Sequence, residues 1–254
     1  MINKLKLIIW FTLRPKYYLH FFFLIKNKFL FNHDTTENSH KAYEWATINA
    51  IPYVDALKKL DLIGDITGLD SDTIAEGQML EAQSFVKMGG AGHIHLLYDC
   101  VRLLKAKKII ETGVAYGWSS LAILKALSET NNGKLYSVDM PYPLENNEKY
   151  VGIVVPKYLR KNWILIREPD RPGIIKALNK IGNQLDLCHY DSDKSWWGRH
   201  YAYPILWKSL RSGGLFISDD VQDNLYFSKY VKNKSLKFAV VEFEGKFVGL
   251  IRKP

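Results

Sequence analysis

The sequence predicts an α/β protein whose core is a doubly wound, Rossmann-like sheet that is mostly parallel. Short apolar runs alternate with helical patterns from residue 93 onward, and this alternation is typical of a parallel sheet covered by helices on both faces. The segment 109–120, IIETGVAYGWSS, also reads as a strand, a tight turn and the start of a helix. The chain of 254 residues is long enough for one such domain with an N-terminal helical extension.

The elements of this sheet are expected in a regular order. A helix at 93–105 precedes the first strand, which ends at Glu111, and another helix follows the turn. The later strands are expected at 135–140, 163–168, 185–191 and 214–220. Helices are expected between them at 172–180 and 201–210. Two strand-like runs in the C-terminal tail, joined by 244–246, predict a hairpin that adds an antiparallel edge to the sheet.

The chain before this sheet divides at a polar segment. Residues 34–41, DTTENSHK, predict a linker. We therefore expect a basic helical extension with its linker at 1–41, and an α/β domain with a helical N-terminal cover at 42–254. Within the cover, a helix is expected from about Ser71, as its N-cap, to Met88.

The formal net charge of +9 is concentrated in the first 33 residues. Six of the 35 basic residues and none of the 26 acidic residues lie there, which leaves the rest of the chain nearly balanced. A balanced body argues against a broad face for binding nucleic acid. The two cysteines, Cys100 and Cys188, lie far apart in apolar patterns and predict buried thiols in a reducing cytoplasm.

The basic extension contains two aromatic-rich apolar runs, at 7–13 and 17–25. Each is well short of the ~20 residues that a membrane-spanning helix needs, and no small-residue cleavage site follows them. A pair of such helices either lies at an anionic membrane surface, covers the core of the domain, or forms the contact of a homodimer. The expected location is the cytoplasm, with peripheral contact at the inner face of the membrane as one alternative.

The turn at 109–120 has the features of a ligand-binding loop. Gly113 and Gly117 let the backbone approach a ligand closely, and the helix N-terminus that follows offers unpaired amides to a carboxylate or phosphate. Ser119 is either the N-cap of that helix alone or an N-cap that also donates to a ligand. The spacing E-x-G-x-x-x-G-x-S differs from the G-x-G-x-x-G of dinucleotide-binding proteins, which disfavours NAD, FAD and a dehydrogenase.

An acidic residue stands at or just beyond the end of every predicted parallel strand. In chain order these residues are Glu111, Asp139, Glu168, Asp191 and the pair Asp219 and Asp220. Ligands of doubly wound sheets bind in the crevice beyond the carboxyl ends of the strands. We therefore expect these side chains to surround one site.

Two of these acids flank the glycine turn in the chain: Glu111 precedes Gly113, and Asp139 ends the next strand. Asp139 ends its strand about half a βαβ unit after the turn, where a carboxylate accepts both hydroxyls of a ribose. The alternative is an N-cap or turn aspartate. Glu111 either contacts the ligand directly or accepts hydrogen bonds from backbone amides of its own loop.

A second group comprises Asp191, Lys194 and the pair Asp219 and Asp220. Neighbouring strand ends bring the three carboxylates into a small volume, where like charges are costly unless a cation or a proton neutralises them. A hard divalent ion such as Mg²⁺ or Mn²⁺ is one solution, and the alternative is that Asp191 binds an amide while Asp220 and Asp223 face solvent. Lys194 is either a base with a lowered pKa or a surface lysine paired with Asp193.

The segments that carry these residues resemble the class I S-adenosylmethionine-dependent methyltransferases. AKKIIETGVAYGWSSLAIL, residues 106–124, is similar to the first motif of the metal-dependent O-methyltransferases, the group that contains catechol and caffeoyl-CoA O-methyltransferases. LDLCHYDSDKSWWGRHY and LRSGGLFISDDV resemble that group's segments around an Asp-x-x-Lys element and a strand ending in Asp-Asn. The chain is also similar to bacterial methyltransferase domains associated with glycan or secondary-metabolite modification. The resemblance covers residues from about 88 to the C-terminus.

The resemblance implies a role for each motif residue. Those that would hold S-adenosylmethionine are Gly113, Gly117 and Ser119 at its methionine end, Asp139 at its ribose and the stretch around Glu168 near its adenine. Those that would act on the acceptor are Asp191, Asp219 and Asp220, as ligands of a divalent cation, and Lys194, as the base that deprotonates a hydroxyl. Two features depart from the metal-dependent group: Asp220 stands where that group has Asn, and the loop 141–155 does not match its substrate elements.

The expected function is methyl transfer from S-adenosylmethionine to a hydroxyl of a small molecule or glycan, with a divalent cation that orients and polarises the acceptor. One alternative is a metal-free methyltransferase in which Asp191 only orients the acceptor. Another is a membrane-associated protein that keeps the fold without turnover.

Overall fold

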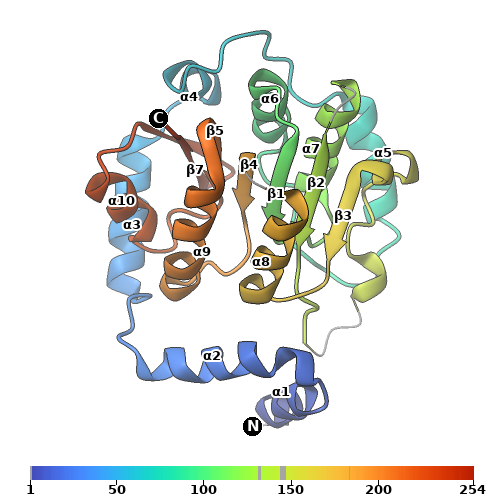
Figure 1. Cartoon of the computed structure of the whole chain (residues 1–254), viewed down its shortest axis with the longest axis vertical. Coiled ribbons are helices and arrows are strands. Elements are labelled where there is room, and N and C mark those ends of the chain that lie inside the picture. Colours follow the sequence, from blue (N-terminus) through green and yellow to red (C-terminus); the bar gives the residue numbers. More distant parts are fainter. Residues whose placement is uncertain (1, 131–132, 144–146, 183) are drawn as a thin grey trace.

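A seven-stranded sheet of order β3-β2-β1-β4-β5-β7-β6 forms the centre of the protein (Figure 1). The computed structural model describes residues 2–130, 133–143, 147–182 and 184–254. The strands are β1 (Lys108–Thr112), β2 (Lys134–Val138), β3 (Trp163–Ile166), β4 (Leu185–Tyr190), β5 (Leu210–Ser218), β6 (Phe238–Phe243) and β7 (Lys246–Arg252). The first five pair in parallel, whereas β7 is antiparallel to both β5 and β6.

This topology confirms the predicted doubly wound sheet. From β1 the chain first builds β2 and β3 on one side, and it then crosses to β4 and β5 on the other side. The strand order therefore reverses between β1 and β4, which is where ligands of such sheets bind. The predicted C-terminal hairpin is also confirmed: Glu244 and Gly245, both with positive φ, form the two-residue turn between β6 and β7.

Helices cover both faces of the sheet (Figure 1). One face packs against α4 (Tyr53–Lys59), α5 (Ser71–Glu81), α6 (Ile94–Leu104) and α7 (Trp118–Glu129). The other face packs against α3 (Thr36–Asn49), α8 (Asp170–Ile181), α9 (Trp196–Ser209) and α10 (Tyr226–Asn233). Short 3-10 helices lie at Pro15–Tyr17, Glu148–Tyr150 and Lys157–Asn162. Cys100 and Cys188 are buried and free, as the apolar patterns around them predict.

Two expectations for the region before the sheet are wrong, and N-terminal caps explain where the two helices begin. Residues 36–41 are not a linker but the first turns of α3, because Thr35 accepts a hydrogen bond from the Asn38 amide and caps the helix. The domain boundary expected at 41–42 thus falls inside a helix. Helix α5 is capped by Asp70, which accepts from the amide and the hydroxyl of Thr73, and it ends at Glu81 rather than Met88.

The N-terminal segment folds into two helices, α1 (Ile2–Thr12) and α2 (Tyr18–Phe29), which lie beyond the carboxyl ends of the parallel strands (Figure 1). Phe11 and Tyr17 are almost completely buried between them and the body of the protein. None of the described helices is long and apolar enough to cross a membrane.

Candidate functional site

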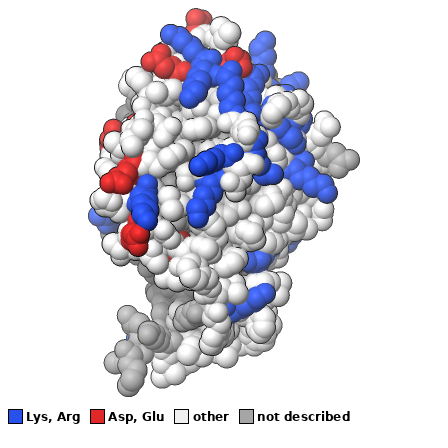
Figure 2. All heavy atoms as spheres, turned by 90° about the vertical axis from the view of Figure 1, so that its left-hand side faces the viewer, with Lys and Arg blue, Asp and Glu red and all other residues white. Residues whose placement is uncertain are grey.

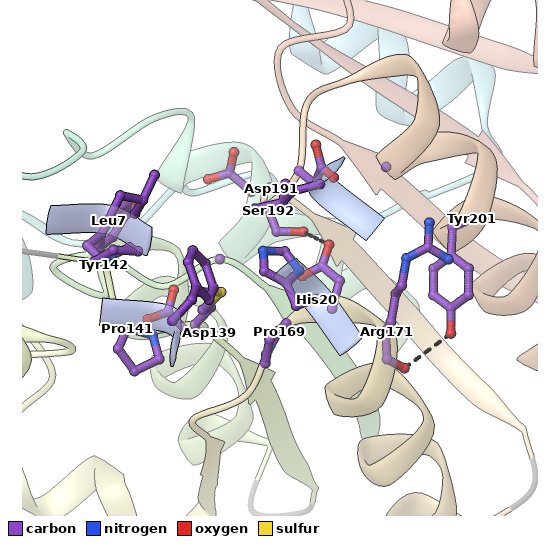
Figure 3. A pocket seen from close by; sticks show the side chains of 18 residues that line it. Leu7, His20, Asp139, Pro141, Tyr142, Pro169, Arg171, Asp191, Ser192 and Tyr201 are labelled. Atoms are coloured by element: carbon purple, nitrogen blue, oxygen red, sulfur yellow. Dashed lines mark hydrogen bonds between the residues drawn. The ribbon is translucent and has the colours of Figure 1, made fainter. Parts of the chain in front are cut away.

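Two adjoining cavities lie beyond the carboxyl ends of the parallel strands. The first has a volume of about 520 Å³ and extends from Gly113 and Asp139 to Asp191. Residues of α1 and α2 line the side of this cavity that faces away from the sheet (Figure 3). The second, of about 480 Å³, lies over the ends of β4 and β5. Residues common to both cavities are Gly113, Tyr142, Asp191 and Ser192. The two cavities therefore meet at the switch point between β1 and β4.

The glycine turn after β1 serves close packing of the chain itself. Gly113 and Gly117 have φ of +81° and +92°, values that favour glycine. A Cβ on Gly113 would overlap the backbone of Asp191, and one on Gly117 would crowd Gly152. Gly117 also caps α7, so the N-cap role predicted for Ser119 is wrong; Ser119 lies in the first turn of the helix and lines the second cavity.

Glu111 is fully buried beneath the cavities. Its Oε2 accepts hydrogen bonds from Ser120 (2.5 Å) and Ser137 (2.6 Å), and its Oε1 lies 3.7 Å from Nδ1 of His189. Nε2 of His189 lies 3.3 Å from Oδ1 of Asp219. Burial by itself would lower the pKa of His189, but the neighbouring carboxylates outweigh it and raise this pKa to about 10. The partners of Glu111 are thus two serines and the protonated His189, which lies next to Asp219, and not the amides of its own loop.

Asp139 stands at the end of β2 and lines the first cavity. Its Oδ1 accepts from the Val114 amide (3.0 Å) in the glycine turn, and its Oδ2 pairs with Arg167. Arg167 makes two further hydrogen bonds to Glu148, of 2.9 and 2.6 Å. Burial raises the pKa of Asp139, although the charge of Arg167 opposes the shift. The structure thus brings Asp139 next to Gly113.

The end of β3 contributes different residues from the one expected. Glu168 pairs with Lys176 (2.5 Å) and is not among the residues that line the first cavity. Pro169, Asp170 and Arg171 line it instead. Asp170 accepts a hydrogen bond from Ser192 (2.5 Å), and burial raises the pKa of Asp170 to about 6.

Asp191, Asp219 and Asp220 come together at the ends of β4 and β5, as the sequence predicts. Lys194 lies between two of them: it pairs with Asp191 and donates to Asp220 Oδ2 at 2.5 Å. Burial would lower the pKa of Lys194, but these carboxylates raise it above its usual value, in contrast to the expected lowering. Burial and the charge of Asp219 raise the pKa of Asp191 to about 6.

Arg199, which we did not single out from the sequence, fixes the backbone of this acidic group. It is fully buried and donates to the carbonyl oxygens of Asp219 (3.2 Å) and Asp220 (2.6 Å) and to Asn224 (3.2 Å). Asp220 has a φ of +52°, a conformation that aspartate tolerates better than most residues. A lone arginine in a helical pattern gives no sign of this role in the sequence.

The carboxylates as arranged do not fit a divalent cation. Lys194 occupies the space between Asp191 and Asp220, and Asp219 faces the charged His189. Among the described residues, no group of three or more His, Cys, Asp or Glu side chains is placed to hold a metal ion. The positive charges of the chain itself therefore balance the acidic group.

The N-terminal segment also contributes to the site, which the sequence did not predict. His20 of α2 points into the first cavity near Ser192, and burial lowers the pKa of its imidazole (Figure 3). The segment is tied down where it leaves α2: Asp34 accepts from the Trp196 amide (2.9 Å) and from Asn224 (2.7 Å). Asp34 thus joins the extension to the start of α9.

Residues 110–221 match the family model described as a methyltransferase domain. The chain is similar in structure to the O-methyltransferase from Bacillus cereus in complex with SAH, with a TM-score of 0.56, 15% identity and coverage of 82% of this chain and 100% of that one. It is also similar to the O-methyltransferase TomG from Streptomyces achromogenes in complex with SAM, with a TM-score of 0.56, 14% identity and coverage of 74% and 93%.

A third similar structure is the SAH-bound methyltransferase PaMTH1 from Podospora anserina, with a TM-score of 0.55, 13% identity and coverage of 87% of this chain and 97% of that one. No curated protein matches the sequence significantly. The family match confirms the resemblance to methyltransferases, and the structural likenesses confirm the fold.

Proposed function

We propose that this chain, whose residues 110–221 form a methyltransferase domain, transfers a methyl group from S-adenosylmethionine to a hydroxyl group of a small-molecule or glycan acceptor. The observation that carries this proposal is the junction of two cavities at Gly113, Asp191 and Ser192. One cavity offers an acid at the end of β2, and the other offers a lysine and carboxylates. A donor and an acceptor bound in the two cavities would meet at this junction.

The first cavity suits the adenosine part of the donor. Asp139 is buried at its wall, and its Oδ2, which pairs with Arg167 in this structure, would accept the ribose hydroxyls beside that arginine. Pro169 and Asp170 would lie beside the base. Ser119 and the first turn of α7, in the second cavity, would take the methionine carboxylate.

S-adenosylmethionine supplies an electrophilic methyl group on a positively charged sulfur. The protein's part is to hold the acceptor oxygen in line with that group and to take its proton. Asp191 suits the second task, because its raised pKa of about 6 leaves it ionised at neutral pH but more basic than an ordinary aspartate. Lys194 remains protonated, so it orients Asp191 and presents a positive charge to the acceptor oxygen.

The experiment is a transfer assay with methyl-labelled S-adenosylmethionine against a panel of hydroxylated small molecules and glycan precursors, with Mg²⁺ and with excess chelator. We expect labelled product, abolished by Asp191→Asn and unchanged by the exposed control Asp72→Asn. Donor binding, measured by calorimetry, should survive in Asp191→Asn. If turnover is the same with chelator, the result supports a site in which Lys194, and not a metal ion, balances the carboxylates. If turnover needs Mg²⁺, it supports the metal-assisted alternative.

Two outcomes would contradict the proposed function. Tighter binding of NAD than of S-adenosylmethionine would indicate a dehydrogenase. Binding of S-adenosylmethionine without transfer to any acceptor of the panel or of a cell extract would favour the non-catalytic alternative.

A further inference from the structure

Helices α1 and α2 each carry exposed apolar side chains on the side that does not pack on the protein. On α2, Tyr18, Phe22, Ile25 and Phe29 recur at helical spacing, and Phe22 and Phe29 are 63% and 85% exposed. On α1 the exposed residues at matching spacing are Leu5, Ile8 and Ile9. We call these seven residues the outer apolar face. A group of exposed apolar side chains such as this marks a site of interaction.

The outer apolar face is distinct from the face by which the helices pack on the protein. Leu7 and Phe11 of α1 and His20 and Leu24 of α2 line the first cavity. Phe23 packs against the guanidinium of Arg171 at 3.8 Å from the ring centre. The helix pair is therefore already anchored on its inner side, and the outer apolar face is left over after this packing.

The charged side chains on the two helices and their connection are all of one sign. Lys6, Arg14, Lys16 and Lys26 lie on the same two helices and their connection, and residues 1–33 contain no Asp or Glu. In Figure 2, the described residues that face the viewer at the lower end of the molecule include basic but no acidic side chains. A partner for this face must thus offer apolar groups together with negative charge.

We propose that the outer apolar face docks on an anionic phospholipid bilayer, with α1 and α2 lying in the plane of the membrane surface. The helices have 11 and 12 residues, too few to span a bilayer but enough to bury one face at its interface. Acidic headgroups attract the flanking lysines and arginine. A second copy of the chain fits less well, because two-fold symmetry would bring these cations against one another.

In this arrangement the bilayer lies on the opposite side of α1 and α2 from the first cavity. Docking uses residues that face away from the site, so it does not require that the protein transfer methyl groups. A failure of the transfer assay and a failure of docking are therefore separate results.

The experiment is cosedimentation of the full chain with vesicles of phosphatidylcholine alone or with phosphatidylglycerol added. We expect binding to the anionic vesicles that weakens at high salt. The double variant Phe22→Ser/Phe29→Ser should lower the partition coefficient by about tenfold or more, since each exposed ring loses burial in lipid. Phe85→Ser/Ile63→Ser removes two strongly exposed apolar side chains elsewhere, 91% and 84% exposed, and should bind like the wild type.

The charge contribution is tested separately by Lys6→Gln/Lys16→Gln/Lys26→Gln. This variant should lose the preference for phosphatidylglycerol while its thermal unfolding stays unchanged, because the three side chains are exposed. The proposal is overturned if the wild type does not bind anionic vesicles, or if the Phe22 and Phe29 variant binds them as well as the Phe85 and Ile63 control. A dimer in light scattering that dissociates on loss of Phe22 and Phe29, without vesicle binding, would assign the face to a second copy.

Discussion

The ammonium group of Lys194 lies 2.5 Å from Oδ2 of Asp220, and it also pairs with Asp191, so that one lysine joins the ends of β4 and β5. The sequence places three carboxylates here and thereby predicts a divalent cation. In the structure a cation of the chain itself stands among them. This relationship decides how the site is expected to respond to metals.

Replacing Lys194 should therefore create an affinity for divalent cations. We expect Lys194→Gln to destabilise the fold by roughly 1–3 kcal/mol, since partly buried carboxylates lose their partner. Mg²⁺ or Mn²⁺ should raise the melting temperature of this variant and leave that of the wild type unchanged. Lys176→Gln, which removes a more exposed ion pair with Glu168, is the control. An equal rise in the wild type would show that Lys194 yields its place to a metal ion.

Asp139 should govern donor affinity. The variant Asp139→Asn keeps the shape of the side chain but loses the charge that would bind ribose hydroxyls, and we expect the Kd for S-adenosylmethionine to rise by about ten- to a hundredfold. Calorimetry measures this change. The control Glu148→Gln loosens Arg167 while leaving the Asp139 carboxylate in place. If Asp139→Asn bound the donor normally, the acid would be only a turn residue that holds the Val114 amide.

His20 should also affect donor affinity, because it reaches the first cavity from α2. His20→Ala removes a ring contact that is worth about 1 kcal/mol, so the Kd for S-adenosylmethionine should rise about fivefold. His33→Ala, in the same extension but stacked on Trp196, serves as the matched control. Equal affinities of the two variants would show that α2 covers the cavity without contacting the donor.

His93 should make the stability of the fold sensitive to acid. Burial lowers its pKa from 6.5 to about 4, so the unfolded chain binds more protons between these pH values. The contribution of His93 is present above pH 6.5 and is lost as the pH falls toward 4, by up to about 3 kcal/mol. His93→Asn retains an N-cap for α6 and should reduce this loss in urea unfolding at pH 7 and pH 5. An unchanged difference would assign the acid sensitivity to other groups.

The parallel sheet and its order of elements could be predicted because they depend on local patterns. Apolar runs of strand length, helical spacing and glycine at positive φ all act within a few residues of the chain. The convergence of Asp139, Asp191, Asp219 and Asp220 also followed, because parallel strands all end at the same edge of a sheet. The boundaries of helices were less accurate. The N-cap of α5 is Asp70 rather than the adjacent Ser71, which offers a nearly equal cap, and the helix ends at Glu81 rather than at Met88.

The sequence by itself thus determined the fold, the position of the crevice and the acids around it. Only the tertiary structure decided which partner each acid has: Arg167 for Asp139, His189 for Glu111, and Lys194 for Asp191. It also decided that α1 and α2 roof the first cavity. Side-chain pairing and the docking of a separate segment depend on contacts between residues far apart in the chain, and they are set by packing and the balance of buried charge rather than by local pattern.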